Sequence, residues 1–407
     1  MEVAPGRGRE LSMDELAIIG VGMHPWGKWG RNFVEYGTFA ARAALEEARV
    51  GWNDVGYISG AITVRNGYPG YVAGATFARA LGFNGAQVAS SYAACASGVT
   101  ALQVARGQIL SGSTDVALVV GADTTPKGFL KPNEGDRPDD TDWLRFKLVG
   151  ATNPVYFGLN ARRRMDLYGA TSEDFARVKV KNSRHAVHNE RARFTKEYDI
   201  DDVMNSPVVS DPLRLLDICA TSDGGAALVV CSMEYAAAHG HTDPVRIAGL
   251  STVTPVYPDT VIDLPYMATD SAGASAEPLR GFKQSIGDKV YEESGLGPSD
   301  VDVAEVYDLS SSLELDWYEQ LGFCAEGEAE QLLRDGVTEI GGRLPVNPSG
   351  GLGAFGEAVP AQAIAQVCEL TWQLRGEAGA RQVDGARVGI SANQGLFGHG
   401  SSVLVRR

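Results

Sequence analysis

The stretch Ser90–Leu102, which reads Ser-Ser-Tyr-Ala-Ala-Cys-Ala-Ser-Gly-Val-Thr-Ala-Leu, constrains the fold of this chain more than any other. A short apolar run, Ala86–Ala89, precedes it, and an amphipathic segment, Ser97–Leu110, follows it. This order predicts a strand, a tight turn of small residues, and a helix with Cys95 at its N-terminus. Unpaired N–H groups and the helix dipole favour a thiolate at that place, so Cys95 is a candidate nucleophile. The alternative is a buried structural cysteine.

Strands and helices alternate around this stretch in two successive passes, which predicts parallel strands joined by helical crossovers. The first pass is interrupted by a long excursion, about residues 122–217, that contains two expected helices, Val155–Tyr168 and Ser172–Asn189. In the second pass, one long helix is expected over Ala354–Leu374. We therefore predict a flexible tail (1–15), an N-terminal half with the excursion (16–243), and a C-terminal half (244–407), which together resemble a duplicated α/β unit.

Charge and cysteine usage restrict the partners of the chain. The formal net charge of −15 over 407 residues argues against nucleic acid as the main partner. The five cysteines are widely spaced and form no Cys-x-x-Cys pair, which is typical of a reduced, cytoplasmic protein without a zinc site. The apolar run Leu16–Met23 is too short for a signal or membrane segment. We expect a cytoplasmic protein with no membrane contact and no bound metal.

The excursion carries a run of basic residues in this acidic chain. Arg162 and Arg163 lie on its first expected helix, and Lys179 and Lys181 lie on its second. Such a basic face is a candidate site for a phosphorylated ligand. The alternative is an ordinary solvated helix face.

Four motifs in order resemble those of the thiolase superfamily, and in particular the sterol-carrier-type thiolases known as non-specific lipid-transfer proteins. The motifs are Cys95–Gly98, Thr221–Ala227, Val306–Leu309 and Asn347–Leu352, with the Gly395–Ser401 loop in the matching place. The resemblance implies two duplicated α/β halves with stacked five-stranded mixed sheets, an α-β-α-β-α layering, and a loop domain that holds coenzyme A. It also implies a coenzyme A thioester as substrate, no bound cofactor, and a homodimer.

Three departures from the thiolase pattern affect its chemistry. The family's Gly-His-Pro triplet is Gly356-Glu357-Ala358 here, and a carboxylate beside a thiol opposes the thiolate. The second cysteine of the C-terminal loop is absent, and the ionisable residue in that loop is His399. The family's Asn-Glu or His-Asp pair is Tyr307-Asp308.

Gly-Glu-Ala and Tyr-Asp are similar to the motifs of thiolase-like steroid side-chain aldolases. That resemblance implies retro-aldol cleavage of a β-hydroxyacyl-CoA and a small zinc-ribbon and OB-fold partner, with which the chain would form a heterotetramer. The chain differs from those aldolases because Val359 and Pro360 stand where they have a second tyrosine, and because it keeps Cys95.

Three hypotheses for function follow. The first is C–C cleavage or acyl transfer on an acyl-CoA thioester with Cys95 as nucleophile, the second is a retro-aldolase that uses Tyr307, and the third is non-catalytic binding of acyl-CoA or lipid. The predicted catalytic residues are Cys95, Tyr307, Asp308, Glu357 and His399, with backbone N–H groups of Gly351, Gly398 and Gly400 at the oxyanion. Each has a structural alternative, such as a helix cap for Asp308, helix-start bonding for Glu357, or packing for His399.

Overall fold

The computed structural model describes residues 15–62, 73–125, 139, 153–255, 282–395 and 398–407. The strands are β1 (Leu16–Gly27), β2 (Tyr57–Ala61), β3 (Gln87–Ser91), β4 (Val116–Thr124), β5 (Val208–Ser210), β6 (Leu213–Arg214), β7 (Asp223–Ser232), β8 (Val245–Val253), β9 (Val303–Val306), β10 (Val388–Gly395) and β11 (His399–Arg406). The helices of the N-terminal half are α1 (Phe33–Ala48), α2 (Ala73–Leu81), α3 (Ser97–Leu110), α5 (Asn153–Tyr168), α6 (Ser172–Ala186), α7 (Ile200–Met204) and α8 (Met233–Ala238). Those of the C-terminal half are α9 (Phe282–Ser294), α10 (Ser311–Gln320), α11 (Ala329–Arg334), α12 (Gly351–Phe355) and α13 (Val359–Arg375).

The two predicted halves share one mixed sheet of nine strands in the order β3-β2-β4-β7-β1-β8-β11-β10-β9. The first five strands come from the N-terminal half and the last four from the C-terminal half. The halves join where β1 pairs antiparallel with β8, from Leu16 opposite Ile247 to Ile18 opposite Val245. The mixed α/β fold class is confirmed. Within the described residues, however, the second half contributes four strands and not the expected five.

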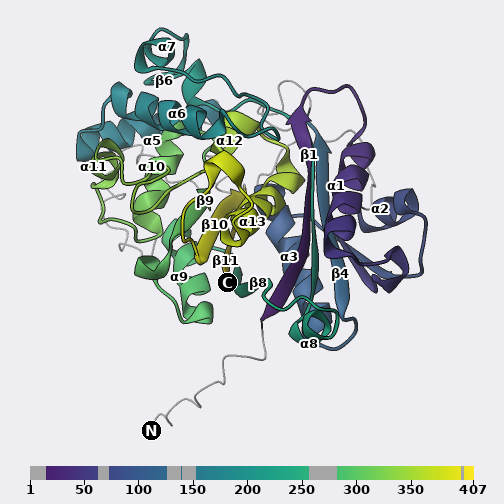
Figure 1. Cartoon of the computed structure of the whole chain (residues 1–407). Coiled ribbons are helices and arrows are strands. Elements are labelled where there is room, and N and C mark those ends of the chain that lie inside the picture. The colour runs from purple at the N-terminus through teal and green to yellow at the C-terminus, as the bar shows by residue number, and fades with distance from the viewer. Residues whose placement is uncertain (1–14, 63–72, 126–138, 140–152, 256–281, 396–397) are drawn as a thin grey trace, which may run out of the picture.

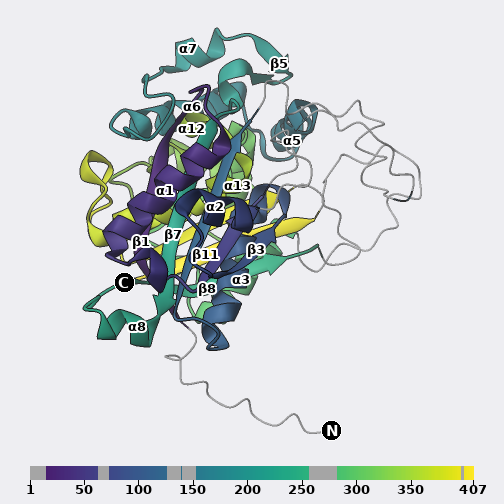
Figure 2. The same ribbon diagram turned by 90° about the vertical axis from the view of Figure 1, so that its right-hand side faces the viewer.

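Helices lie on both faces of each half, and two of them lie between the halves. In Figure 1, α3 and α13 lie between the β1–β4 region and the β9–β10 region, while α1 covers the far side of the first region and α9 and α10 cover that of the second. Figure 2 shows α1 and α2 in front of the strands of the N-terminal half. Three apolar cores correspond to these layers: one beneath α1 and α2, one around α3 and α13, and one beneath α9 and α10.

The two central helices pack closely because small residues face each other. A side chain added at Gly98 on α3 would meet Ile364 Cγ1 on α13 at 2.8 Å, which is too close for a real contact. Such close approach is a typical use of glycine in a helix interface. As a result, the start of α3, where Cys95 lies, is held against the start of α13, where Glu357 lies.

The expected long helix over Ala354–Leu374 is divided in the structure. The helix α12 ends at Phe355, and α13 begins at Val359. Gly356 has a φ of 74°, in the left-handed region that ends helices, and Pro360 lies in the first turn of α13. The sequence prediction of one helix was wrong because apolar periodicity continues across this break. The break places Glu357 at a buried corner between the two helices.

The excursion of the N-terminal half contains α5, α6 and α7 and the small β5–β6 pair among its described residues. In Figure 1 it lies over α12 at the top of the C-terminal half. No helix among the described residues is long and apolar enough to cross a membrane.

Candidate active site

Cys95 lies in a single 3-10 turn (Ala94–Ala96) between β3 and α3. Ala94 has a φ of 47°, a left-handed conformation that is strained for a residue with a side chain. Ser97 fixes the turn, because its Oγ accepts from Ala93 N at 2.9 Å and donates to Ala94 O at 2.6 Å. Cys95 is buried, and its turn directly precedes α3, as the sequence predicts.

Tyr307 follows the last residue of β9 and is buried. Its backbone is fixed by Trp317, whose Nε1 donates to the Tyr307 carbonyl at 3.0 Å. Its hydroxyl donates to Cys95 Sγ at 2.8 Å. Burial, reinforced by the neighbouring Cys95 and Glu357, raises the pKa of Tyr307 well above its ordinary value. The phenol is therefore protonated at neutral pH and acts as a hydrogen-bond donor.

Glu357 is held in place by the Thr221–Ala227 motif and by Ala220 directly before it. Its backbone N–H donates to Ala220 O at 2.7 Å, and its carbonyl accepts from Ser222 N at 2.9 Å. A side chain at Gly356 would meet Ser222 Oγ at 2.4 Å, so the glycine before Glu357 is required by both space and its positive φ. The motif therefore contributes backbone contacts that orient Glu357.

The carboxylate of Glu357 completes a triangle of polar groups. Its Oε1 lies 3.1 Å from Cys95 Sγ and 3.5 Å from the Tyr307 hydroxyl. The three side chains come from positions far apart in the sequence, and all are at least nine-tenths buried. An apolar surrounding strengthens hydrogen bonds between such groups. The structure thus joins a thiol, a phenol and a carboxylate into one buried cluster.

Asp308 lies beside this unit and fixes the start of α12. It accepts from Leu352 N at 2.6 Å, from Gly353 N at 3.1 Å and from Asn182 Nδ2 at 3.1 Å. Burial, followed by the charge of Glu314, raises its pKa to about 8, against the N–H donors that lower it. Asp308 is therefore a positioning residue that ties the segment after Tyr307 to the Asn347–Leu352 motif.

The raised pKa of Asp308 predicts a specific pH dependence of stability. The folded protein holds this proton more tightly than the unfolded chain, whose pKa stays near 3.8, so stability is lost as pH rises from about 4 to about 8. Asp308→Asn mimics the protonated form and removes this loss. We compare the free energy of unfolding of the variant with that of wild type at each pH. The difference, variant minus wild type, is expected to be larger at pH 8.5 than at pH 5 by on the order of 1 kcal/mol or more. Urea titrations at both pH values measure it, and a constant difference between the two proteins would contradict the assignment.

Cys219 is a residue at this site that the sequence reasoning did not single out. It is buried in the same apolar core as Cys95 and Tyr307, and its N–H donates to Leu309 O at 2.9 Å. Burial, followed by the charge of Glu357, raises its pKa well above the ordinary value for a thiol. Its position two residues before the Thr221–Ala227 motif was the signal that could have identified it.

Gly351 begins α12, and Gly398, His399 and Gly400 lie at the start of β11. The N–H of Gly351 is used within its own loop, where it donates to Ser349 Oγ at 3.1 Å. His399 is exposed at the start of β11, and Gly398 and Gly400 beside it are buried. A side chain at Gly395, which pairs with His399, would meet Ala93 O at 2.3 Å, so this hairpin passes directly against the Cys95 turn.

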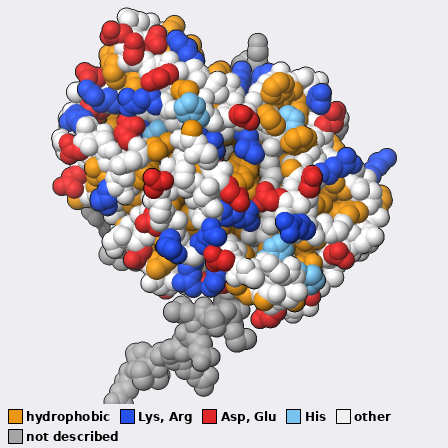
Figure 3. Space-filling model, in the orientation of Figure 1, with side chains coloured by type: hydrophobic (Ala, Val, Ile, Leu, Met, Phe, Trp, Pro, Cys, Tyr) orange, Lys and Arg blue, Asp and Glu red, His pale blue; other side chains and the backbone are white. Residues whose placement is uncertain are grey.

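The four basic residues of the excursion do not form one surface. Arg162 is exposed and pairs with Asp211, and Arg163 is half-buried. Lys179 is buried and donates to Gly353 O at 2.7 Å, while Lys181 is fully buried and pairs with Glu314 at 2.9 Å. Figure 3 shows acidic and basic side chains intermingled over this part of the molecule. The two lysines therefore act inside the protein, and only the arginines can reach a ligand in solvent.

The sequence matches the family "Thiolase, N-terminal domain" over residues 16–234 and "Thiolase C-terminal domain-like" over residues 271–406. The chain belongs to the thiolase family. Two curated thiolase-family relatives are similar over nearly its full length. Sterol carrier protein 2 of Rattus norvegicus is 34% identical over 411 residues, which cover 97% of this chain and 72% of that protein. An acetyl-CoA acetyltransferase of Methanothermobacter thermautotrophicus is 33% identical over 404 residues, which cover 97% of this chain and 99% of that protein.

A solved structure, "Ltp2-ChsH2(DUF35) aldolase", superposes on this thiolase-family chain with a TM-score of 0.78. The two chains are 28% identical, and the superposition covers 97% of this chain and 98% of the other. Together with the relatives above, it supports a thiolase-like enzyme, in agreement with both resemblances found in the sequence.

Proposed function

We propose that this thiolase-family enzyme cleaves the Cα–Cβ bond of a β-hydroxyacyl-CoA thioester by a retro-aldol reaction. The observation that carries the proposal is the buried contact of Tyr307 with Cys95 and Glu357, at 2.8 and 3.5 Å from the phenol oxygen. This arrangement supplies one acid and one base at the same place. A retro-aldol step needs that pair, because one proton leaves an oxygen and one proton arrives at a carbon.

In the proposed reaction, Glu357 accepts the proton of the β-hydroxyl group, and Tyr307 relays it. The C–O bond then becomes a carbonyl, the Cα–Cβ bond breaks, and its electron pair moves into the thioester as an enolate. Glu357, which then carries the β-hydroxyl proton, returns it through Tyr307 to Cα, and this protonation of the enolate gives a shortened acyl-CoA and an aldehyde or ketone. The raised pKa of Tyr307 keeps the phenol protonated at the start of the reaction, so it takes up the β-hydroxyl proton only as it passes its own proton to Glu357. Stabilisation of the enolate oxygen by N–H groups of Gly398 and Gly400 remains a prediction.

A second candidate function is acyl transfer through Cys95. It is favoured by the 3.1 Å contact between the thiol and the Glu357 carboxylate, which could serve as the base that deprotonates Cys95. The same contact also opposes it, because a thiolate beside a carboxylate is repelled by its charge. We therefore place Cys95 in the wall of the site and assign the proton transfers to Tyr307 and Glu357.

Mass spectrometry of the enzyme and its products tests the proposal. After incubation with long-chain and steroidal β-hydroxyacyl-CoA substrates, a shortened acyl-CoA with unmodified Cys95 supports retro-aldol cleavage. An acyl adduct on Cys95 that turns over with free coenzyme A supports acyl transfer instead. Unchanged ligand that nevertheless co-elutes with the protein leaves the third hypothesis, binding of acyl-CoA or lipid without chemistry.

We propose further that Arg162 and Arg163 contribute to binding of the coenzyme A phosphates. The double variant Arg162→Ala and Arg163→Ala is expected to weaken acyl-CoA binding about tenfold at low salt, with a smaller effect at high salt because phosphate contacts are screened. Calorimetric titration at two salt concentrations measures this. Arg177→Ala is the matched control, since Arg177 is exposed on α6 and pairs with Glu173 one turn away. Equal affinities of the double variant and the control would place the phosphate site elsewhere.

We also propose a homodimer that forms through β3. Among the described strands, β3 ends the sheet, and its residue Val88 is 45% exposed, so its outer edge pairs with no described strand. Val88→Lys is expected to give a monomer in size-exclusion chromatography with light scattering. Leu167→Lys is the control, because Leu167 is equally apolar and 58% exposed but lies on α5. An unchanged mass for Val88→Lys would exclude this edge as the interface.

A small partner that completes the site is the last part of the proposal. Its support is the name of the aldolase structure, which includes a second component, ChsH2(DUF35). We expect a zinc-ribbon and OB-fold chain that excludes water from the site and forms a heterotetramer with the dimer. Co-purification with the products of neighbouring genes tests this expectation. A homodimer with full activity and no captured partner would remove it.

A further inference from the structure

Two buried polar residues at the end of β4 contact the backbone of Glu357 and its helix, and the reaction proposed above gives them no role. Asp123 is the second-last residue of β4, and Thr125 directly follows the strand. Asp123 is 0% exposed and Thr125 is 1% exposed. The Thr125 Oγ1 lies 3.0 Å from Asp123 Oδ2 and 3.2 Å from the Glu357 carbonyl oxygen. Since a hydroxyl group has one proton to donate, these two oxygens share it.

Asp123 faces the start of α13, where the N-cap residue Ala358 offers no side-chain oxygen. Burial raises the pKa of Asp123 to about 6, while the Thr125 hydroxyl and the nearby N–H groups of Thr124 and Val359 lower it. The carboxylate is therefore ionised above about pH 6, and a negative charge suits the N-terminus of a helix. Asp123 thus links the end of β4 to the first residue of α13, two residues after Glu357.

Thr125 is itself held in place by Lys28. The Lys28 ammonium donates to the Thr125 carbonyl and pairs with Asp223 at 2.8 Å. Asp223 is the first residue of β7 and lies opposite Thr124 where β4 and β7 pair. The Thr125 hydroxyl is therefore attached to the edge of the central sheet, and it connects this edge with the carbonyl of Glu357.

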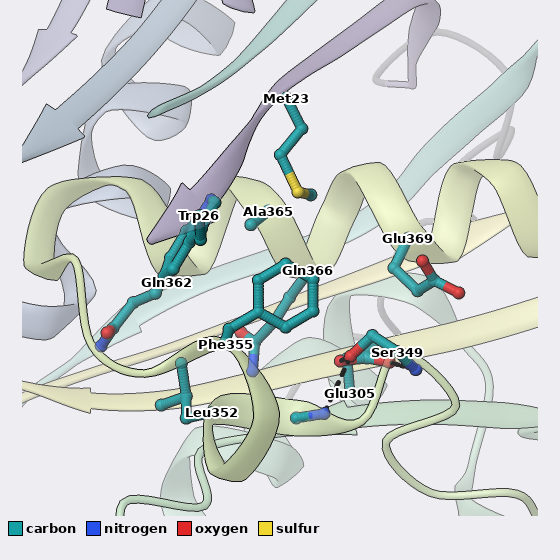
Figure 4. Close-up of a pocket in the computed structure, with 11 residues that line it drawn as sticks. Met23, Trp26, Glu305, Ser349, Leu352, Phe355, Gln362, Ala365, Gln366 and Glu369 are labelled. Carbon is teal, nitrogen blue, oxygen red and sulfur yellow. Dashed lines mark hydrogen bonds between the residues drawn. The ribbon is translucent and has the colours of Figure 1, made fainter. Parts of the chain in front are cut away.

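Backbone bonds and apolar packing supply other contacts of the corner between α12 and α13. Ser222 N donates to the same Glu357 carbonyl at 2.9 Å. The rings of Trp26 and Phe355 meet edge-on with their centroids 5.2 Å apart, and Figure 4 shows both beside the first turns of α13. Apolar packing has little directional preference, whereas hydrogen bonds have a preferred direction. Thr125 therefore adds an oriented side-chain contact to the backbone from which the Glu357 carboxylate extends.

We infer that Thr125 is a positioning residue, which holds the Glu357 carboxylate against Cys95 and Tyr307. Its effect on catalysis rests on the proposed function, in which Glu357 is the base. The Glu357 carbonyl and side chain share one Cα, so a rotation of the carbonyl moves Oε1 away from Cys95 Sγ, which now lies at 3.1 Å. Small displacements of a reacting group cost rate and leave substrate binding largely unchanged.

Thr125→Val keeps the side-chain shape and is expected to lower kcat about tenfold, with KM within about twofold. Thr125→Ser restores the hydroxyl and should recover most of kcat. Added to Glu357→Gln, Thr125→Val should cause no further loss, because the base that it positions is already absent. Thr371→Val is the control and should keep kcat within about twofold, since Thr371 is also fully buried but its hydroxyl donates to Val367 O at 2.7 Å inside α13.

Alkylation of Cys95 by iodoacetamide measures the position of Glu357 without any substrate. A carboxylate beside the thiol opposes the thiolate, so Glu357→Gln should raise the alkylation rate at pH 8 about threefold or more. Thr125→Val should change the rate in the same direction, and it should add nothing to the effect of Glu357→Gln. Mass spectrometry follows the reaction, with the partly exposed Cys324 as the internal reference.

The two readouts separate this role from the proposed function and from a loosened fold. If wild type gives no shortened acyl-CoA, the proposed function fails, and the alkylation rates decide the role of Thr125. A wild-type kcat in an active enzyme, or a wild-type alkylation rate, would overturn the role for Thr125→Val. Equal effects with and without the Glu357 carboxylate would also overturn it. Thr125→Ala removes the same hydroxyl with no added methyl group against Asp123 and serves if Thr125→Val folds poorly.

Discussion

Replacement of Tyr307 by phenylalanine is expected to lower kcat for cleavage of a β-hydroxyacyl-CoA by about 10³-fold, in the range that a general acid–base residue contributes. The reason is the place of the phenol, which donates to Cys95 Sγ at 2.8 Å and lies 3.5 Å from the Glu357 carboxylate. Without its hydroxyl, the β-hydroxyl proton has no relay to Glu357. Because Glu357 is the proton acceptor, Glu357→Gln should lower kcat to a similar extent. Steady-state assays of the shortened acyl-CoA product measure both effects.

Two further variants distinguish retro-aldol cleavage through Tyr307 from a loss of stability and from acyl transfer through Cys95. Tyr291→Phe is the structural control, since Tyr291 is also buried and its hydroxyl also donates a hydrogen bond, to the Leu321 carbonyl at 3.0 Å, but outside the site. It should keep kcat within about twofold while losing about 1 kcal/mol of stability, the usual net contribution of one hydrogen bond. Cys95→Ala should retain most of the retro-aldol activity. If Cys95→Ala is inactive and Tyr307→Phe is active, the enzyme transfers acyl groups through the thiol.

The sequence predicted the parts of the site that depend on local order. Cys95 lies in a tight turn between a strand and a helix because small residues and the change from a strand to a helical pattern are local signals. Tyr307 at the end of β9 could be predicted for the same reason. Motif order placed both near Glu357, and the structure brings the three groups within hydrogen-bonding distance.

Other features depend on tertiary contacts that no local pattern contains. The break between α12 and α13 is set by Gly356 packing against Ser222, more than a hundred residues away in the chain. The burial of Lys179 depends on α6 packing against the Gly351–Phe355 segment, where its ammonium reaches Gly353 O. A basic residue on a helix reads as solvated in the sequence, because the carbonyl or carboxylate that receives it lies on another element.

Lys181 shows most clearly how such a buried charge organises the site. Its ammonium is fully buried between Glu314 at 2.9 Å and the Val346 carbonyl at 2.7 Å. Glu314 also accepts from Asn182 at 2.6 Å and from Asn347 at 2.7 Å. Asn182 in turn donates to Asp308, so one network connects α6, α10 and the Asn347–Leu352 motif directly behind Tyr307.

Lys181→Met is expected to lower the free energy of unfolding by about 3–5 kcal/mol, because it leaves the Glu314 carboxylate buried without its counter-charge. Lys196→Met is the matched control. Lys196 forms an ion pair with Asp202 at 3.3 Å, but its side chain is 64% exposed, and exposed pairs contribute under about 1 kcal/mol. Urea denaturation of both variants measures the difference, and similar small losses would show that Glu314 is neutral in the folded protein. Lys181→Met combined with Glu314→Gln should recover part of the lost stability, since the uncompensated charge is then gone. The same two variants test an effect on catalysis. If Lys181→Met lowers kcat and the double variant restores it, this network acts on catalysis through the position of Asp308.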